Sequence, residues 1–124
     1  QPMVLPDPAA NAPAIPVALS LQGVPYVAGG ATPASGFDCS GFVSYVYAQI
    51  GKKVPHFTGD IWNAFPHVPM DQIAPGDLIL MDGLGHVGLY LGGDQYIHAP
   101  HSGDVVRIAS LAARAGDIQG AVRP

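Results

Sequence analysis

The sequence predicts an α+β domain in which helices come first and a sheet of antiparallel strands follows. In the first half, apolar residues after Cys39 recur at helical spacing, at Phe42, Val43 and Val46. In the second half, short apolar runs alternate with turns rich in Gly, Pro and Asp, which is typical of successive strands. Helices followed by a series of strands is an α+β layout.

Composition limits the function classes. A chain of 124 residues suffices for one domain with a modest core. Its 16 glycines and 13 prolines predict many loops, while a hydrophobic fraction of 48% argues against disorder. The formal net charge is −4, every acidic residue is Asp, and no run of Lys or Arg occurs, so we expect neither a nucleic-acid nor a membrane-surface partner. We expect a monomer that needs no cofactor.

The N-terminal segment differs in composition from the rest. Residues 1–14 are rich in Pro and Ala, which predicts an extended arm or the end of a linker, and the domain itself is expected over 15–124. No apolar run is long enough to span a bilayer, and no charged segment followed by an apolar one marks a signal peptide. Because Gln1 is an uncommon natural start, we expect a mature or excised fragment.

The remaining elements are predicted in order. A short helix over 17–22 has Pro16 in its first turn and is stopped by Gly23. The helix at Cys39 has Asp38 as its N-cap and Gly51 after its end, and a short helix near 60–65 follows. Strands are then predicted over 77–81, 86–91, 95–99, 104–108 and 118–122, with a short helix at 110–114 before the last.

Cys39, the only cysteine, lies in the first turn of its helix and on the same face as the core residues. The unpaired N–H groups of a first turn favour a thiolate over a thiol and can stabilise an oxyanion beside the sulfur. A lone cysteine is otherwise most often a small buried hydrophobe. The helix alone leaves both interpretations open.

Two histidines on neighbouring predicted strands supply possible partners for the thiol. Strand parity places His86 and His98 on the same face of the sheet. A three-residue loop centred on Gly92, with Gly93 in a left-handed conformation, would set the two histidines directly opposite each other. A thiol and two histidines predict a cysteine-nucleophile triad. Because the chain contains no Glu, the orienting member of the triad cannot be one.

Other roles for the histidines are less well supported. Cys39, His86, His98 and His101 could in principle form a zinc shell, but the spacing of the last two fits neither a finger nor a hydrolase, so we expect no metal. The other two histidines, at 56 and 67, fall in Pro-flanked loops and are expected to be solvated. Trp62 is expected to be a core or groove-wall anchor.

Several stretches together resemble the NlpC family of bacterial cell-wall cysteine endopeptidases. Residues 36–42 (GFDCSGF) resemble its nucleophile motif, 85–92 its histidine strand and 96–99 its third-residue strand. Residues 24–30 and 73–78 resemble its spacer motifs, and the likeness covers about residues 15 to 122 in the family's order. The resemblance implies a papain-like fold and hydrolysis of peptidoglycan stem peptides, usually between D-glutamate and meso-diaminopimelate, by a secreted or envelope protein.

The resemblance also implies roles for single residues. Carried over by position, Cys39 is the nucleophile, His86 the base and His98 the residue that orients it. Tyr26 would line the site near the oxyanion, while Asp38 and Ser40 would contact the peptide end of the substrate.

The sequence departs from the family's pattern at Ala28, where a bulky tryptophan is common, and this change would open that side of the groove. A peptidoglycan-binding module without hydrolysis is one alternative, although all three triad positions are intact. A cysteine amidase or acyltransferase on the same scaffold is a second alternative, and the sequence does not exclude it.

Overall fold

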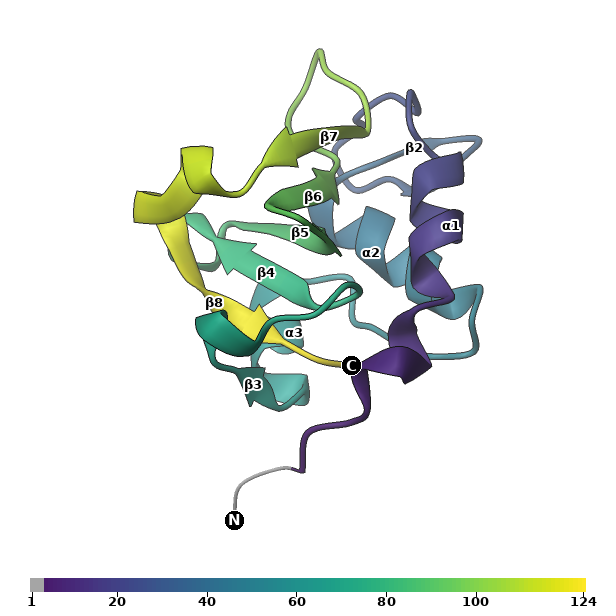
Figure 1. Cartoon of the computed structure of the whole chain (residues 1–124). Helices are drawn as coiled ribbons and strands as arrows, with labels where there is room; N and C mark the ends of the chain where they lie inside the picture. The colour runs from purple at the N-terminus through teal and green to yellow at the C-terminus, as the bar shows by residue number, and fades with distance from the viewer. Residues whose placement is uncertain (1–3) are drawn as a thin grey trace.

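The computed structural model describes residues 4–124. Figure 1 shows helices α1 and α2 beside a twisted antiparallel sheet, as the α+β prediction requires. The α-helices are α1 (Ala14–Ser20), α2 (Cys39–Ala48) and α3 (Thr58–Ala64). Short 3₁₀ helices are η1 (Pro8–Asn11), η2 (Met70–Gln72), η3 (Asp82–Leu84) and η4 (Ala112–Asp117).

The main sheet has six strands in the spatial order β3-β8-β4-β5-β6-β7. These strands are β3 (His67–Val68), β4 (Leu78–Met81), β5 (His86–Gly92), β6 (Gln95–His98), β7 (Arg107–Ser110) and β8 (Ile118–Val122). A separate hairpin pairs β1 (Ala31–Thr32) with β2 (Gly36–Phe37), in a stretch where no strand is predicted. Strands β4 to β7 form the expected meander, whereas β8 crosses back to pair with β3 and β4.

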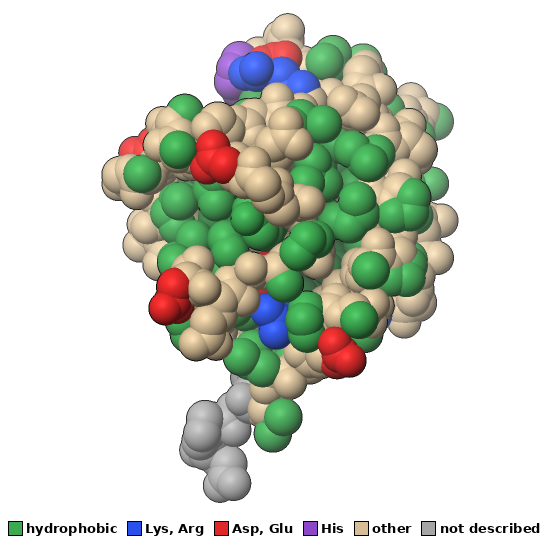
Figure 2. Space-filling model, viewed as in Figure 1, with side chains coloured by type: hydrophobic (Ala, Val, Ile, Leu, Met, Phe, Trp, Pro, Cys, Tyr) green, Lys and Arg blue, Asp and Glu red, His purple; other side chains and the backbone are tan. Residues whose placement is uncertain are grey.

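Hydrophobic side chains bury both faces of the sheet. Alternate residues of β4 divide between two clusters, since Leu78 and Leu80 pack toward the helices and Ile79 and Met81 toward the opposite face. The main core joins the sheet to α1, α2 and α3, and it contains the apolar stripe of α2 that the sequence predicts. Figure 2 shows the broad hydrophobic area that faces the viewer in this orientation, with charged side chains standing apart around it.

The N-terminal segment differs from the extended arm expected over 1–14. Residues 1–3 lie outside the described part of the chain, but η1 forms over 8–11, with the Asp7 carboxylate accepting from the backbone N–H of Ala9. Asn11 is fully buried, and its amide donates to the carbonyl of Pro124 at 3.0 Å. Helix α1 begins at Ala14, earlier than predicted, because Ala14 and Ala18 form a buried face.

The fourth strand of the meander starts later than predicted, at Arg107 rather than at 104. The backbone of Val106 instead pairs with Val24, donating to its carbonyl at 2.8 Å, and the carbonyl of Asp104 accepts from Tyr26. Residues 104–106 therefore hold the segment that precedes β1 against the domain. That segment carries Tyr26 toward the start of α2.

Candidate active site

Asp38 and Cys39 begin helix α2 as predicted. The Asp38 carboxylate Oδ1 accepts from the backbone N–H of Gly41 at 2.7 Å, which is the N-cap hydrogen bond. Cys39 follows as the first helical residue and is half-buried. Backbone amides at Val87, Ser40 and Cys39 itself lie close enough to lower the pKa of the thiol, so the sulfur lies near the start of β5.

The pKa of Cys39 depends on more than its place at the start of a helix. Burial raises the pKa of the thiol above its usual range, and the negative charge of Asp38 adds to the rise. The backbone hydrogen bonds lower the pKa, as a helix N-terminus should, but burial outweighs them. The N–H groups of the helix end therefore do not set the pKa of Cys39 by themselves, and burial favours the neutral thiol.

His86 and His98 meet directly, although not in the predicted register. Tyr90 pairs with Tyr96 and Gly92 with Gln95, so the hairpin turns at Gly93–Asp94, both with positive φ, instead of around Gly92. The two histidines are thus diagonal neighbours on one face, which still lets the rings touch. His86 Nε2 and His98 Nδ1 lie 2.7 Å apart.

Gly88 makes room for this arrangement. It lies between His86 and Tyr90 on the same face of β5, and a Cβ atom there would come within 2.6 Å of the Tyr96 ring. Without that side chain, the Tyr96 ring can stack against His98, with ring centroids 4.6 Å apart. Any larger residue at position 88 would displace the face that carries both histidines.

Both histidines are held neutral. Burial, followed by the positive charge of Arg114, lowers the pKa of His86 from 6.5 to about 4. Burial also lowers the pKa of His98, and the charges of His86 and Arg107 add to the effect. A neutral imidazole beside a neutral thiol can accept a proton from it, which is the starting condition for general-base catalysis.

Asp38 has more partners than its capping role requires. Besides Gly41, its Oδ1 lies 2.7 Å from His56 Nε2, and its Oδ2 accepts from the backbone N–H of Gly29 at 3.1 Å. His56 lies in an exposed loop as expected, but its ring also pairs with Asp38. His67 also has a structural partner, since its Nε2 lies 2.9 Å from the carbonyl of Trp62.

Tyr26 and Ser40 lie in the same neighbourhood. Burial raises the pKa of the Tyr26 hydroxyl, and the charges of Cys39 and Asp38 raise it further, which places that hydroxyl close to both. Ser40 is almost fully buried and lines a cavity of about 510 Å³ together with Cys39 and Phe57. The six residues singled out by the sequence thus gather around the start of α2 and the start of β5.

Comparison with known proteins agrees with this arrangement. The model of the NlpC/P60 family matches residues 23–116. The chain belongs to the NlpC/P60 family. It is 44% identical over 93 residues to Protein P54 of Enterococcus faecium, covering 72% of this chain and 18% of that protein. It is 39% identical over 107 residues to peptidoglycan endopeptidase RipA of Mycobacterium tuberculosis, covering 75% of this chain and 23% of that protein.

Solved structures of this family share the fold. The peptidoglycan hydrolase RipB of M. tuberculosis superposes with a TM-score of 0.82 at 36% identity, covering 93% of this chain and 64% of that one. The NlpC/p60 domain of the peptidoglycan hydrolase SagA gives a TM-score of 0.82 at 37% identity, covering 96% of this chain and 100% of that one. The chain spans about a quarter or less of the length of the curated relatives named above.

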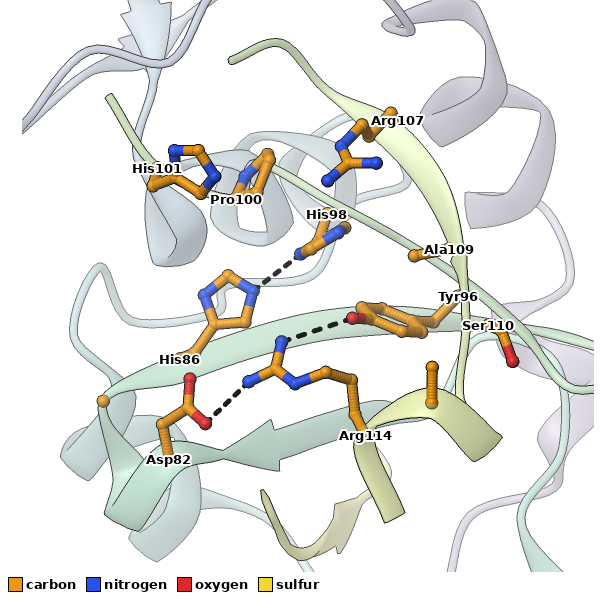
Figure 3. A pocket seen from close by; sticks show the side chains of 12 residues that line it. Asp82, His86, Tyr96, His98, Pro100, His101, Arg107, Ala109, Ser110 and Arg114 are labelled. Carbon is orange, nitrogen blue, oxygen red and sulfur yellow. Dashed lines mark hydrogen bonds and ion pairs between the residues drawn. The ribbon is translucent and has the colours of Figure 1, made fainter. Parts of the chain in front are cut away.

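The NlpC/P60 site also contains charged residues that the sequence analysis missed. Figure 3 shows Asp82 and Arg114 paired beneath the two histidines, with Nη2 of Arg114 2.6 Å from Oδ1 of Asp82. Arg107 reaches over His98 from β7. Arg107 and Arg114 come from the segment after the last motif histidine, so no motif spacing linked them to the site. Only their place beside predicted strand ends could have drawn attention to them.

The part of the chain that the structure describes contains neither a metal-binding cluster nor a membrane-spanning helix. Within residues 4–124, no group of three or more His, Cys, Asp or Glu side chains is arranged to hold a metal ion. No helix in the same part of the chain is long and apolar enough to cross a membrane.

Proposed function

We propose that this NlpC/P60 domain is a cysteine endopeptidase that cuts peptidoglycan stem peptides. The observation that carries the proposal is the contact of the Cys39 thiol with the backbone at Val87, next to a neutral histidine pair. His86 is held at Nε2 by His98, and Figure 3 shows its other ring nitrogen pointing away from His98. The relatives named as peptidoglycan endopeptidases support the substrate class.

In the proposed reaction, Nδ1 of His86 takes the thiol proton as the Cys39 sulfur attacks the carbonyl carbon. N–H groups of the first turn of α2 stabilise the tetrahedral oxyanion. His86 then gives the proton to the leaving amine, and a thioester on Cys39 remains. Water, deprotonated by His86, hydrolyses the thioester and restores the thiol.

His98 fixes the tautomer that this sequence of steps needs. If Nδ1 of His86 accepts the proton, Nε2 must carry hydrogen and donate it to Nδ1 of His98. His98 then carries its own hydrogen on Nε2. His98 is thus a positioning residue, since it exchanges no proton with the substrate.

The proposed substrate-binding roles follow from atoms of the site that can still form hydrogen bonds. Oδ2 of Asp38 has one protein partner, so it can still accept from a substrate ammonium, such as the free N-terminus of a stem peptide. Tyr26 lies near the oxyanion, and Ser40 lines the cavity beside the sulfur. The bond we propose is the one between D-glutamate and meso-diaminopimelate, in a secreted or envelope-bound monomer.

Incubation of the chain with purified peptidoglycan and mass spectrometry of the products tests this proposal, with Cys39→Ala as the control. We expect fragments that begin with a free diamino acid amine, and none from the variant. Release of intact stem peptides from the sugar would instead indicate an amidase. Tight binding without any cleavage would indicate a binding module and would refute the proposal.

A further inference from the structure

A second cavity, of about 540 Å³, lies beside the histidine pair (Figure 3). It is lined by His86 and His98 together with Arg107 and Arg114. Gly85 borders both this cavity and the one beside Cys39, so the two meet next to His86. The reacting bond would lie at that junction.

The chemistry assigns the two halves of a substrate to the two cavities. The acyl half becomes bonded to sulfur, so it stays with the cavity that Cys39 lines. The leaving amine must be within hydrogen-bond reach of the group that protonates it, which is His86. The leaving half therefore lies toward the cavity that His86 lines.

The two arginines of this cavity differ in how they are held. Arg114 uses Nε on Asp117, Nη2 on Asp82 and Nη1 on the Tyr96 hydroxyl, so each of its three nitrogens has a partner. Arg107 is about half exposed, and its ion pair with Asp104 involves only Nε. Both terminal nitrogens of Arg107 have no ion-pair partner among residues 4–124, and Figure 3 shows its guanidinium turned toward His98.

Charge and an unpartnered atom point to the same occupant. Among the cavity-lining residues two Arg stand against one Asp, which pairs with Arg114, while the Asp104 carboxylate balances Arg107 from its Nε side and leaves its terminal nitrogens open. His98 is 3% exposed, and its buried Nε2 has no hydrogen-bond partner among residues 4–124. In the productive tautomer this atom is an N–H facing the side of Arg107, where a negative charge would stabilise it.

We propose that the Arg107 cavity is the subsite for the leaving half of the substrate and binds a carboxylate on its diamino acid. This inference rests on the proposed function. A bidentate guanidinium–carboxylate contact uses the two free nitrogens of Arg107. The carboxylate at the far end of a diaminopimelate side chain meets this requirement, and lysine, which has the same chain without that group, does not.

Two tripeptides test the subsite, L-Ala-γ-D-Glu-meso-diaminopimelate and L-Ala-γ-D-Glu-L-Lys. Their binding is measured by calorimetry with the Cys39→Ala chain, so that neither is cut. We expect the diaminopimelate peptide to bind about tenfold more tightly, as one partly exposed charge-assisted contact allows. Adding Arg107→Gln should remove the difference, Arg107→Lys should restore part of it, and Lys53→Gln, the same charge change at an exposed site elsewhere, should preserve it.

Equal affinities for the two peptides in the Cys39→Ala chain would overturn the subsite, whether or not the wild type cleaves either. A difference that survives Arg107→Gln would overturn the assignment to Arg107. Turnover of both peptides by the wild type at equal rates would refute the subsite while leaving the proposed endopeptidase activity in place. Thermal unfolding of each variant shows whether Arg107→Gln leaves the fold intact.

Discussion

Two buried polar pairs in this domain are built differently. Asp77 and Arg123 form a two-pronged ion pair, with Nε–Oδ1 at 2.8 Å and Nη2–Oδ2 at 3.0 Å. The remaining capacity of Arg123 goes to backbone carbonyls, and Asp77 also accepts from the N–H of Ala74. His86 and His98 share one hydrogen bond, and Nε2 of His98 has none.

The difference separates structure from chemistry. The Asp77–Arg123 pair joins the loop before β4 to the end of the chain after β8, and each nitrogen of the guanidinium has a partner. The histidine pair, by contrast, retains unused hydrogen-bonding capacity at Nε2 of His98 among the described residues. Unsatisfied polar groups of this kind concentrate where a protein acts on another molecule. The two pairs should therefore respond oppositely to mutation.

The largest effect should come from the proposed proton-transfer pair. We expect Cys39→Ala and His86→Ala each to lower turnover about 10⁴-fold or more, and the double variant to lose no more than either alone. Stability should change by no more than about 1 kcal/mol in Cys39→Ala, since a small half-buried group is lost. Steady-state kinetics and thermal unfolding measure both, and additive losses would contradict a single catalytic unit.

The ion pair should show the reverse pattern. Arg123→Met leaves the fully buried Asp77 carboxylate without its charged partner, so we expect a loss of about 3–5 kcal/mol in the free energy of unfolding. Activity per folded molecule should not change. The matched control is Arg107→Met, which breaks an exposed pair and should cost about 1 kcal/mol or less. Denaturant unfolding measures both losses. Similar losses in the two variants would show that burial does not determine how much each ion pair stabilises the fold.

His98 should combine a clear loss of activity with little loss of stability. His98→Ala removes the group that orients His86, and we expect turnover to fall on the order of 10²-fold. His98→Asn can still accept from Nε2 of His86 and should recover part of that loss. The free energy of unfolding should change little, because an unpartnered buried nitrogen is removed as well. Wild-type turnover in His98→Ala would assign the orienting role elsewhere.

The order and type of the main elements could be predicted from sequence because local patterns encode them. The apolar stripe after Cys39 and the strand at 118–122 match the structure closely. The helix at 17–22 and the strand at 104–108 shift because tertiary pairing decides their ends: buried Ala14 extends one, and the backbone pairing of Val106 with Val24 shortens the other. Local propensity does not contain that information.

The residues of the site also divide into those that local sequence patterns predict and those that tertiary contacts place. Cys39, His86 and His98 lie together because motif and strand parity are local properties of the chain, and a register shift of two residues still leaves the histidines on one face. The pKa of Cys39 could not be predicted from its helix, since burial by residues distant in sequence decides it. His56 and Arg107 reach the site from loops and edges whose paths depend on the whole fold.

The pH dependence of the domain should reveal the buried histidines. With the pKa of His86 lowered to about 4, activity should persist as pH falls below 6.5 and decline near pH 4. The free energy of unfolding should fall as the pH drops from about 6.5 to about 4. In that interval the unfolded chain binds protons at these histidines and the folded chain does not. His98→Asn should make that stability slope shallower, and an activity profile with its acid limb at pH 6.5 would contradict the lowered pKa.

The smallest effect should come from Asp38→Asn, which separates capping from substrate binding. Asn is a comparable N-cap, and the pair with His56 is partly exposed, so stability should change by about 1 kcal/mol at most. We expect the wild type to cleave stem peptides with a free N-terminal amine faster than acetylated ones, because the remaining lone pairs of Oδ2 face an ammonium with full charge. Asp38→Asn should abolish that preference. The control His56→Gln leaves the Asp38 carboxylate in place and should retain the preference. Equal wild-type rates on both peptides would limit Asp38 to capping α2 and holding the loop at Gly29.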